Sequence, residues 1–226
     1  VLAEGARVDG LTPRTHARTS AINISGNGQK NELVGNAGNN ILDGGGGKDT
    51  LIGLGGDDTY IVDQSDEVIY ETVGSGTDTV LTSVNFTLSE LSDLEVLRAR
   101  DAAGTSALVL KGNGLANRIE GNAGNNSLYG GGGDDTLIGL GGHDLIFGGA
   151  GTDTFVINGN EEAENFYIYS RDAFLAANPG ATIGAASNIV ITRNGSTEAD
   201  IVAELNSIEE IKVNTTATPN LGVLAD

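Results

Sequence analysis

A nine-residue period is the feature that most constrains the fold of this chain. From Gly26 to Ile61 the sequence reads GNGQKNELV, GNAGNNILD, GGGGKDTLI and GLGGDDTYI. A second, closely similar block from Gly112 to Val156 reads GNGLANRIE, GNAGNNSLY, GGGGDDTLI, GLGGHDLIF and GGAGTDTFV. A sustained short period is typical of solenoids, in which each repeat buries its apolar residues against the next. A flexible Gly-rich linker has no reason to keep an apolar residue at every ninth position.

The apolar residue of each repeat stands at position eight, counted from the first glycine. Its nine occupants are Leu33, Leu42, Leu51, Tyr60, Ile119, Leu128, Leu137, Ile146 and Phe155. One residue on each side completes a very short strand with one inward side chain, and six residues of turn follow. Two nonapeptides therefore make one coil of about 18 residues, and successive coils stack as parallel sheets about 4.8 Å apart.

Composition limits what such a solenoid can bind. Lys plus Arg number 12 and Asp plus Glu number 31, which gives a formal net charge of -19 and argues against nucleic acid as a partner. The chain has no Cys, so we expect any metal to be a hard cation held by oxygen. No apolar run reaches the roughly 18 residues of a membrane span, and the first 25 residues lack the apolar core of a signal peptide. The absence of an initiator Met suggests a fragment of a longer chain.

Position six brings acidic side chains into columns. Residues one coil apart would stack as Asn31 with Asp49, Asn40 with Asp58, Asn117 with Asp135 and Asp153, and Asn126 with Asp144. Two carboxylates one strand spacing apart repel by about 1 kcal/mol in water, and by more at lower dielectric. Glycines at positions one, two and four permit positive φ and leave backbone carbonyls unshielded. Carbonyls and carboxylates together are the ligands that Ca²⁺ prefers.

These repeats approximate GGxGxDxUx, where U is apolar, and are similar to those of the RTX (repeats-in-toxin) family of haemolysin-type calcium-binding proteins. The resemblance implies an all-β fold, a parallel β-roll or right-handed β-helix solenoid, with Ca²⁺ between stacked loops. In that family one loop offers the carbonyls of positions two and four, the next offers positions one and three, and each adds its position-six side chain. Carried over, one site uses Asn36, Gly38 and Asn40 with Gly53, Gly55 and Asp58, and another uses Gly131, Gly133 and Asp135 with Gly148, Ala150 and Asp153.

The resemblance implies several calcium ions, at least five. The remaining ligands that it implies are Asn31, Gly44, Gly46, Asp49, Asp78, Asn117, Asn122, Gly124, Asn126, Gly130, Gly132, Gly139, Gly141 and Asp144. Asn replaces Asp at position six in the first two repeats of each block, while Gln29 and Leu115 replace the glycine at position four. Asn still offers a side-chain oxygen but no charge, so these sites should be weaker.

Between the blocks, residues 62–111 are expected to be a degenerate spacer that continues the solenoid. Glu67 falls at position six of VDQSDEVIY, and after two extra residues Gly74, Gly76 and Asp78 restore the pattern. These residues would extend the columns from Asp49 to Glu67 and from Asp58 to Asp78, although a solvated acidic turn explains them equally well.

The flanking segments depart from the period. Residues 1–25 are expected to be an N-terminal segment or linker, and residues 157–226 a small C-terminal cap that covers the end of the roll. Within the cap, residues 170–180 predict a short helix with Ser170 as N-cap and Asn178 near its end. A hairpin around Asn194 and Gly195 and a further strand in SIEEIKV should follow. An exposed cap could instead bind a carbohydrate or protein partner.

No catalytic motif accompanies the repeats. The two histidines, His16 and His143, cannot form an HExxH site, and GxSxG is absent. We therefore expect no enzyme activity from this chain. The resemblance implies a module of a secreted bacterial protein that passes the type I secretion machinery unfolded and folds on Ca²⁺ outside the cell. Two alternatives remain: an appendage of a secreted polysaccharide-modifying or hydrolytic enzyme, and a saccharide-binding adhesin module at the cell surface.

Overall fold

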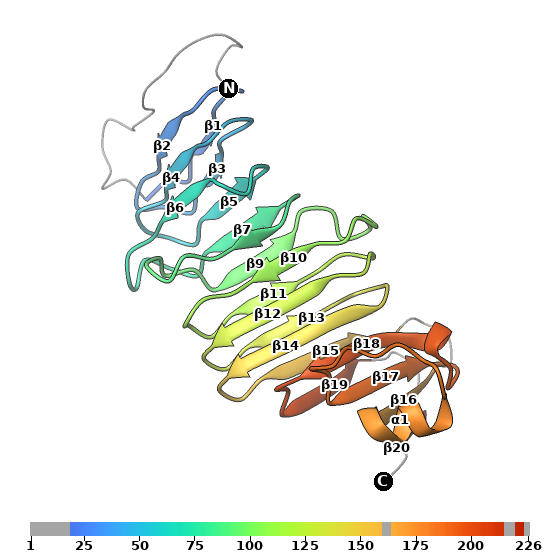
Figure 1. Cartoon of the computed structure of the whole chain (residues 1–226). Coiled ribbons are helices and arrows are strands. Elements are labelled where there is room, and N and C mark those ends of the chain that lie inside the picture. The colour runs from blue at the N-terminus through green and yellow to red at the C-terminus, as the bar shows by residue number, and fades with distance from the viewer. Residues whose placement is uncertain (1–18, 160–163, 215–219, 224–226) are drawn as a thin grey trace.

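The computed structural model describes residues 19–159, 164–214 and 220–223. Its strands stack along one axis, from β1 and β2 near the N-terminal end to β18 and β19, and α1 lies beyond them at the C-terminal end (Figure 1). The structure is thus a parallel β-solenoid with a small C-terminal addition, as predicted.

Two sides of the solenoid carry the strands. One side is a nine-stranded sheet that consists of β1 (Asn23–Ser25), β3 (Ile41–Asp43), β5 (Thr59–Val62), β7 (Thr79–Thr82), β9 (Val96–Ala99), β11 (Arg118–Glu120), β13 (Thr136–Ile138), β15 (Thr154–Asn158) and β19 (Glu210–Asn214). The other side begins with a three-stranded sheet of β2 (Glu32–Val34), β4 (Thr50–Ile52) and β6 (Val68–Tyr70). It continues in a separate sheet with β8 (Phe86–Thr87), β10 (Val109–Lys111), β12 (Ser127–Gly132), β14 (Asp144–Ala150) and β18 (Ile201–Asn206).

The register confirms that two nonapeptides make one coil. Asn23 pairs with Ile41, Ile41 pairs with Thr59, and Ser127 pairs with Leu145, each one coil further along. All of these pairs are parallel, so equivalent loops lie above one another. Position-six residues are therefore held in columns by the strands that follow them.

Position eight forms the core, as the period predicts. Leu33, Leu42, Leu51 and Tyr60 are each 0% exposed, and the same cluster extends along the axis to Phe155. Burying one such side chain contributes about 1.5–3 kcal/mol, and each coil buries two of them. The glycines keep the loops small, and the strand residues form a continuous apolar core.

The glycines serve two different purposes. Positive φ occurs at positions two and four of several repeats, for example 115° at Gly131 and 92° at Gly133, and even Leu140 at position two has φ 75°. The nine position-one glycines, all within the described ranges, do not adopt it. Gly130 is instead required by close approach, because a Cβ at this position would overlap Oδ2 of Asp135 and the carbonyl of Gly148.

The segment between the blocks continues the stack through β6 to β10. Its coils vary in length: Thr59 pairs with Thr79, Thr79 with Val96, and Val96 with Arg118. The inserted residues lie in the loops, so the strands keep their places while the loops differ from those of the regular repeats.

The C-terminal segment completes both sides of the roll. β18 pairs in parallel with β14, bringing Leu205 beside Ile146, and β19 pairs with β15, bringing Ile211 beside Phe155. The predicted hairpin is formed by β18 and β17 (Ile189–Arg193), which pair antiparallel. β16 (Asn165–Ser170) pairs antiparallel with β17 and parallel with β20 (Asn220–Val223).

The predicted helix is α1 (Arg171–Ala177). Ser170 is its N-cap and accepts a hydrogen bond from the Ala173 amide, and Asn178 is its C-cap. Phe174 packs with Tyr169 and Val190 in a second small core. No helix in the described ranges is long and apolar enough to cross a membrane.

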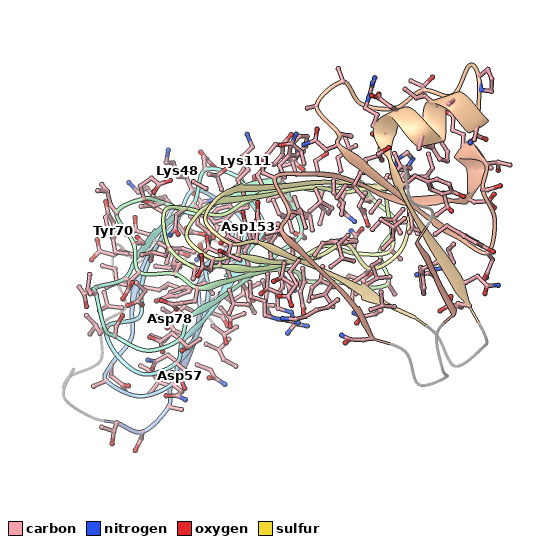
Figure 2. All side chains as sticks on the ribbon, turned by 90° about the horizontal axis from the view of Figure 1, so that it is seen from below. Lys48, Asp57, Tyr70, Asp78, Lys111 and Asp153 are labelled. Atoms are coloured by element: carbon pink, nitrogen blue, oxygen red, sulfur yellow. The ribbon has the colours of Figure 1, made fainter. Side chains whose placement is uncertain are left out.

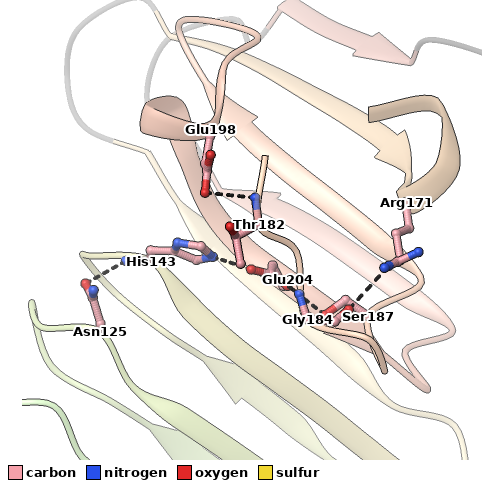
Figure 3. A network of polar contacts seen from close by, with 8 residues as sticks. All are labelled: Asn125, His143, Arg171, Thr182, Gly184, Ser187, Glu198 and Glu204. Carbon is pink, nitrogen blue, oxygen red and sulfur yellow. Dashed lines mark hydrogen bonds and ion pairs between the residues drawn. The ribbon is translucent and has the colours of Figure 1, made fainter. Parts of the chain in front are cut away.

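A polar network joins this segment to the last regular coils (Figure 3). Nε2 of His143 lies 2.8 Å from Oε1 of Glu204. Oε2 of Glu204 accepts hydrogen bonds from the Gly184 amide at 2.7 Å and the Ser187 hydroxyl at 2.8 Å. The buried Glu204 carboxylate thus links a solenoid loop to a loop of the cap.

Candidate metal centres

Position six forms the columns that the coil length predicts. The backbone amide of Asn31 donates to Oδ1 of Asp49 at 2.7 Å, and the amide of Asn117 donates to Oδ1 of Asp135 at the same distance. The amide of Asp135 in turn donates to Oδ1 of Asp153 at 2.9 Å. Asn40 with Asp58 and Asn126 with Asp144 repeat the contact, so it occurs on both sides of the roll. One carboxylate oxygen of each aspartate is therefore held by the preceding coil.

The second carboxylate oxygen is left without a protein partner in most of these aspartates. Within the described ranges, buried Oδ2 atoms with no hydrogen bond belong to Asp49, Asp58, Asp78, Asp135 and Asp153. Asp78 and Asp153, labelled in Figure 2, are both 0% exposed. A buried carboxylate oxygen without a donor is costly, and a cation would satisfy it. The oxygen-rich surroundings fit a hard divalent cation such as Ca²⁺.

Burial also raises the pKa values of these carboxyl groups. Burial raises the pKa of Asp135 to about 7, although the Asn117 amide lowers it in part, and the negative charge of Asp153 adds to the increase. Burial likewise raises the pKa of Asp144 to about 7. Without a cation, these carboxyl groups therefore keep their protons up to nearly neutral pH.

Backbone carbonyls face the same space. A Cβ on Gly26 would meet the carbonyl of Gly44, one on Gly35 the carbonyl of Gly53, and one on Gly130 the carbonyl of Gly148. Position-one carbonyls therefore point along the axis into the preceding loop, next to the position-six side chains. Ligand roles for the other predicted loop residues, including Gly46, Gly55, Gly132, Gly141 and Ala150, remain predictions.

Asn40 and Asn126 occupy these cages differently from the prediction. Nδ2 of Asn126 donates to the carbonyls of Asn122 at 3.0 Å and Gly124 at 2.6 Å, and to Oδ1 of Asp144 at 3.1 Å. Nδ2 of Asn40 makes the equivalent bonds to Asn36, Gly38 and Asp58. In this placement the amide nitrogen faces the acceptors of the loop. The ligand role of the side-chain oxygens of Asn40 and Asn126 remains a prediction.

The position-six Asn in the first repeat of each block is oriented differently. Oδ1 of Asn117 accepts a hydrogen bond from the Asn113 amide of its own loop at 2.8 Å, and Oδ1 of Asn31 does the same with Asn27. Nδ2 of Asn117 donates to the Leu94 carbonyl of the preceding coil at 2.9 Å. Here the side-chain oxygen points into its own loop, as the position-six carboxylates do elsewhere.

The columns are longer than the sequence suggests. The Asp58 amide donates to Oδ1 of Asp78 at 2.8 Å, and the Asp78 amide donates to Oε2 of Glu95 at 2.8 Å. The Asp153 amide donates to Oε2 of Glu209 at 2.7 Å. Asp153 therefore does not end its column, as the nonapeptides alone imply. Glu161 and Glu162, which follow Asp153 in the sequence, lie outside the described residues.

Glu95 and Glu209 could have been found from the sequence. Each stands two residues before a strand residue at position eight, since Leu97 pairs with Val80 and Ile211 with Phe155. Neither is preceded by the Gly-rich turn, which hides the period. Glu67 stands at the same position, but its Oε1 accepts from the amides of Asp63 and Gln64 in its own loop.

One group of three carboxylates comes together within the part of the chain that the structure describes. Asp58, Glu71 and Asp78 are all buried, and one carboxylate oxygen of each lies within 4.8 Å of the others. Glu71 belongs to no recognised repeat and was not among the predicted ligands.

Comparison with known proteins agrees with this geometry. The family model of the RTX calcium-binding nonapeptide repeat matches four copies, over residues 25–60, 111–145 and 130–156. No curated protein and no solved structure matches the chain.

Proposed function

Because the chain carries RTX calcium-binding nonapeptide repeats in a β-roll, we propose that it is a noncatalytic module that folds on Ca²⁺ outside a bacterial cell. Proteins with these repeats are typically secreted, and passage through type I secretion machinery suits a chain that stays unfolded at low cytosolic calcium. In this proposal the module is part of a larger secreted or surface protein.

The unpartnered Oδ2 atoms are the observation that carries the proposal. Five buried aspartates present such an oxygen, spread along both columns. Each needs a positive partner, and the position-one carbonyls next to it provide further oxygen ligands. Ca²⁺ supplies the charge that the protein itself does not.

The charge of the whole chain explains why folding should depend on the ion. A formal net charge of -19 opposes compaction, and the folded state adds buried carboxylates close to one another. An ion that binds the folded state and not the unfolded chain stabilises it by mass action. At low calcium the repulsion dominates, and at extracellular calcium the bound ions offset it.

A calcium titration of the whole chain tests the proposal. Far-ultraviolet circular dichroism in chelator should show a coil-like spectrum, and added Ca²⁺ should convert it cooperatively to a β-rich one. Mg²⁺ is the control, because it prefers a smaller octahedral shell with bound waters and should not replace Ca²⁺ at equal concentration. A cooperative β spectrum in chelator, unchanged by Ca²⁺, would show that the fold does not depend on the ion.

A further inference from the structure

We propose that Asp58, Glu71 and Asp78 form a three-carboxylate cation site that differs in kind from the repeating sites of the roll. Its occupant would be Ca²⁺, and a trivalent lanthanide would bind it at least as well. The inference rests on the proposed function, because it assumes that cations bind between these loops.

The sequence sets Glu71 apart from the regular repeats. All nine nonapeptides begin with Gly, whereas the residue that follows β6 is Glu71. Since Ile52 pairs with Tyr70, Glu71 takes the place above Gly53, the position-one glycine of the coil before. Glu71 and Thr72 are the two extra residues of this loop, and they give it room for a side chain.

The side chain of Glu71 turns into the stack. It is 5% exposed, and Asp58 and Asp78 are 1% and 0% exposed. A Cβ on Gly53 would collide with Oδ2 of Asp58 and Oε1 of Glu71, so these two oxygens converge over the same glycine. Oδ2 of Asp58 and Oδ2 of Asp78 have no hydrogen-bond partner among the described residues.

Tyr60 provides a second sign that this coil is built differently. It is the one tyrosine among the nine position-eight residues, and its hydroxyl donates to Oε1 of Glu71. Ser75 donates to the other oxygen, Oε2, at 2.8 Å. A glutamate in place of the loop glycine thus occurs together with a hydroxyl in place of an apolar core residue. The pair holds the third carboxylate in position.

These three charges have no ion-pair partner among the described residues. Within residues 19–159, 164–214 and 220–223, no Lys or Arg forms an ion pair with Asp58, Glu71 or Asp78. Three carboxylates in one buried place repel strongly, and a hard cation of charge two or three removes that repulsion. Among the described residues, no second group of three acidic side chains meets at such short distances. We therefore expect this site to be the tightest of the chain.

Tyr60 also makes the site observable. Terbium emits when a nearby aromatic ring absorbs light, and Tyr60 touches a ligand of this site. The chain has no Trp. Among the described tyrosines, Tyr70 is 54% exposed, Tyr129 stacks on Phe147, and Tyr167 and Tyr169 lie in β16. Tyr70 and Tyr129 directly precede Glu71 and Gly130 and can sensitise terbium as well, so the difference between the parent and Tyr60→Phe isolates the emission that passes through Tyr60.

The test is a terbium titration of the whole chain with excitation of tyrosine. The parent should begin to emit at the lowest terbium concentrations. Glu71→Gln should shift the onset to about tenfold higher concentration, which corresponds to about 1.4 kcal/mol. Tyr60→Phe should lower the emission at the lowest terbium concentrations, while equilibrium dialysis finds the same number of bound ions. Glu32→Gln, in an exposed strand position, is the matched control and should behave like the parent.

The outcomes separate this inference from the proposed function. Unchanged emission in both Glu71→Gln and Tyr60→Phe, with Ca²⁺ still inducing the fold, would overturn the three-carboxylate site alone. A parent chain that binds neither Ca²⁺ nor Tb³⁺ would overturn the proposed function as well. Circular dichroism in saturating Ca²⁺ shows whether each variant folds. If Glu71→Gln does not fold, Tyr60→Phe decides: lower emission at unchanged ion count supports the site, and unchanged emission overturns it.

Discussion

At the scale of single residues, the choice between Asp and Asn at position six decides what fills a cage. Asp135 leaves Oδ2 unpartnered, whereas Asn126 places its amide nitrogen among acceptors from its own loop and the next. The amide donates neutral hydrogen bonds to oxygens that a cation would otherwise bind.

Replacing that amide should create a cation site. In Asn126→Asp the donor becomes a carboxylate oxygen, which faces two loop carbonyls and Asp144 and requires a cation. We expect isothermal calorimetry or dialysis to find about one more Ca²⁺ per chain than in the parent. Asn125→Asp is the control, since it adds the same charge at the neighbouring position and keeps the acceptor for the His143 amide. Equal ion counts in the two variants would contradict the role of the Asn126 amide.

At the scale of elements, the cap strands extend the solenoid. β18 adds Leu205 to the apolar line after Ile146, and this side chain is 0% exposed. Val202 lies on the same strand and packs against the same core, but is only partly buried. The last regular coil is thus covered by strands of the same register, which also blunts the edges of both sheets.

Truncating Leu205 should show how much this covering contributes. Leu205→Ala should lower the free energy of unfolding by about 2–5 kcal/mol, because it opens a cavity at the junction between cap and roll. Chemical denaturation in saturating Ca²⁺ measures the loss. Val202→Ala is the control, and it should lower the free energy of unfolding clearly less. If the two substitutions cost the same, β18 does not continue the core in the way the register indicates.

The elements that the sequence predicts are those set by the period. The nine-residue spacing alone predicts the coil length, the inward position eight and the pairing of Asp135 with Asp153. Cap and turn residues predict the helix that begins after Ser170 and the hairpin near Asn194. Glu71 escapes prediction because its place depends on how a longer loop folds over Gly53. Glu209 is hard to recognise because no Gly-rich turn precedes it, although it stands two residues before Ile211, which pairs with Phe155. The orientation of the Asn126 amide depends on neighbours one coil away.

At the scale of the whole molecule, buried carboxylates oppose the fold unless they are neutralised. Burial raises the pKa of Glu67, Asp78, Asp135 and Asp144 to about 7 each. Two agents can neutralise them, a bound cation or a proton. A cation needs several oxygen ligands around it, whereas a proton binds a single carboxyl group. The effects of the two can therefore be told apart.

Acid should therefore replace calcium in part. A carboxyl group whose pKa is about 7 in the folded state and about 4 in the unfolded chain favours the folded state when it is protonated. Its contribution is complete below about pH 4 and is lost as the pH rises through about 7. Chain freed of Ca²⁺ by dialysis should thus gain β structure as the pH falls from 7 toward 4, followed by circular dichroism.

Proton binding should also change the calcium concentration that is needed for folding. Because protons and Ca²⁺ occupy the same oxygens, the calcium concentration needed for folding should rise as the protons bind, even while the ion-free fold becomes more stable. A double variant, Asp135→Asn with Asp144→Asn, removes two of the four groups and should flatten the acid-induced gain. If the ion-free chain loses β structure steadily from pH 7 to pH 4, the buried carboxyl groups do not control its stability.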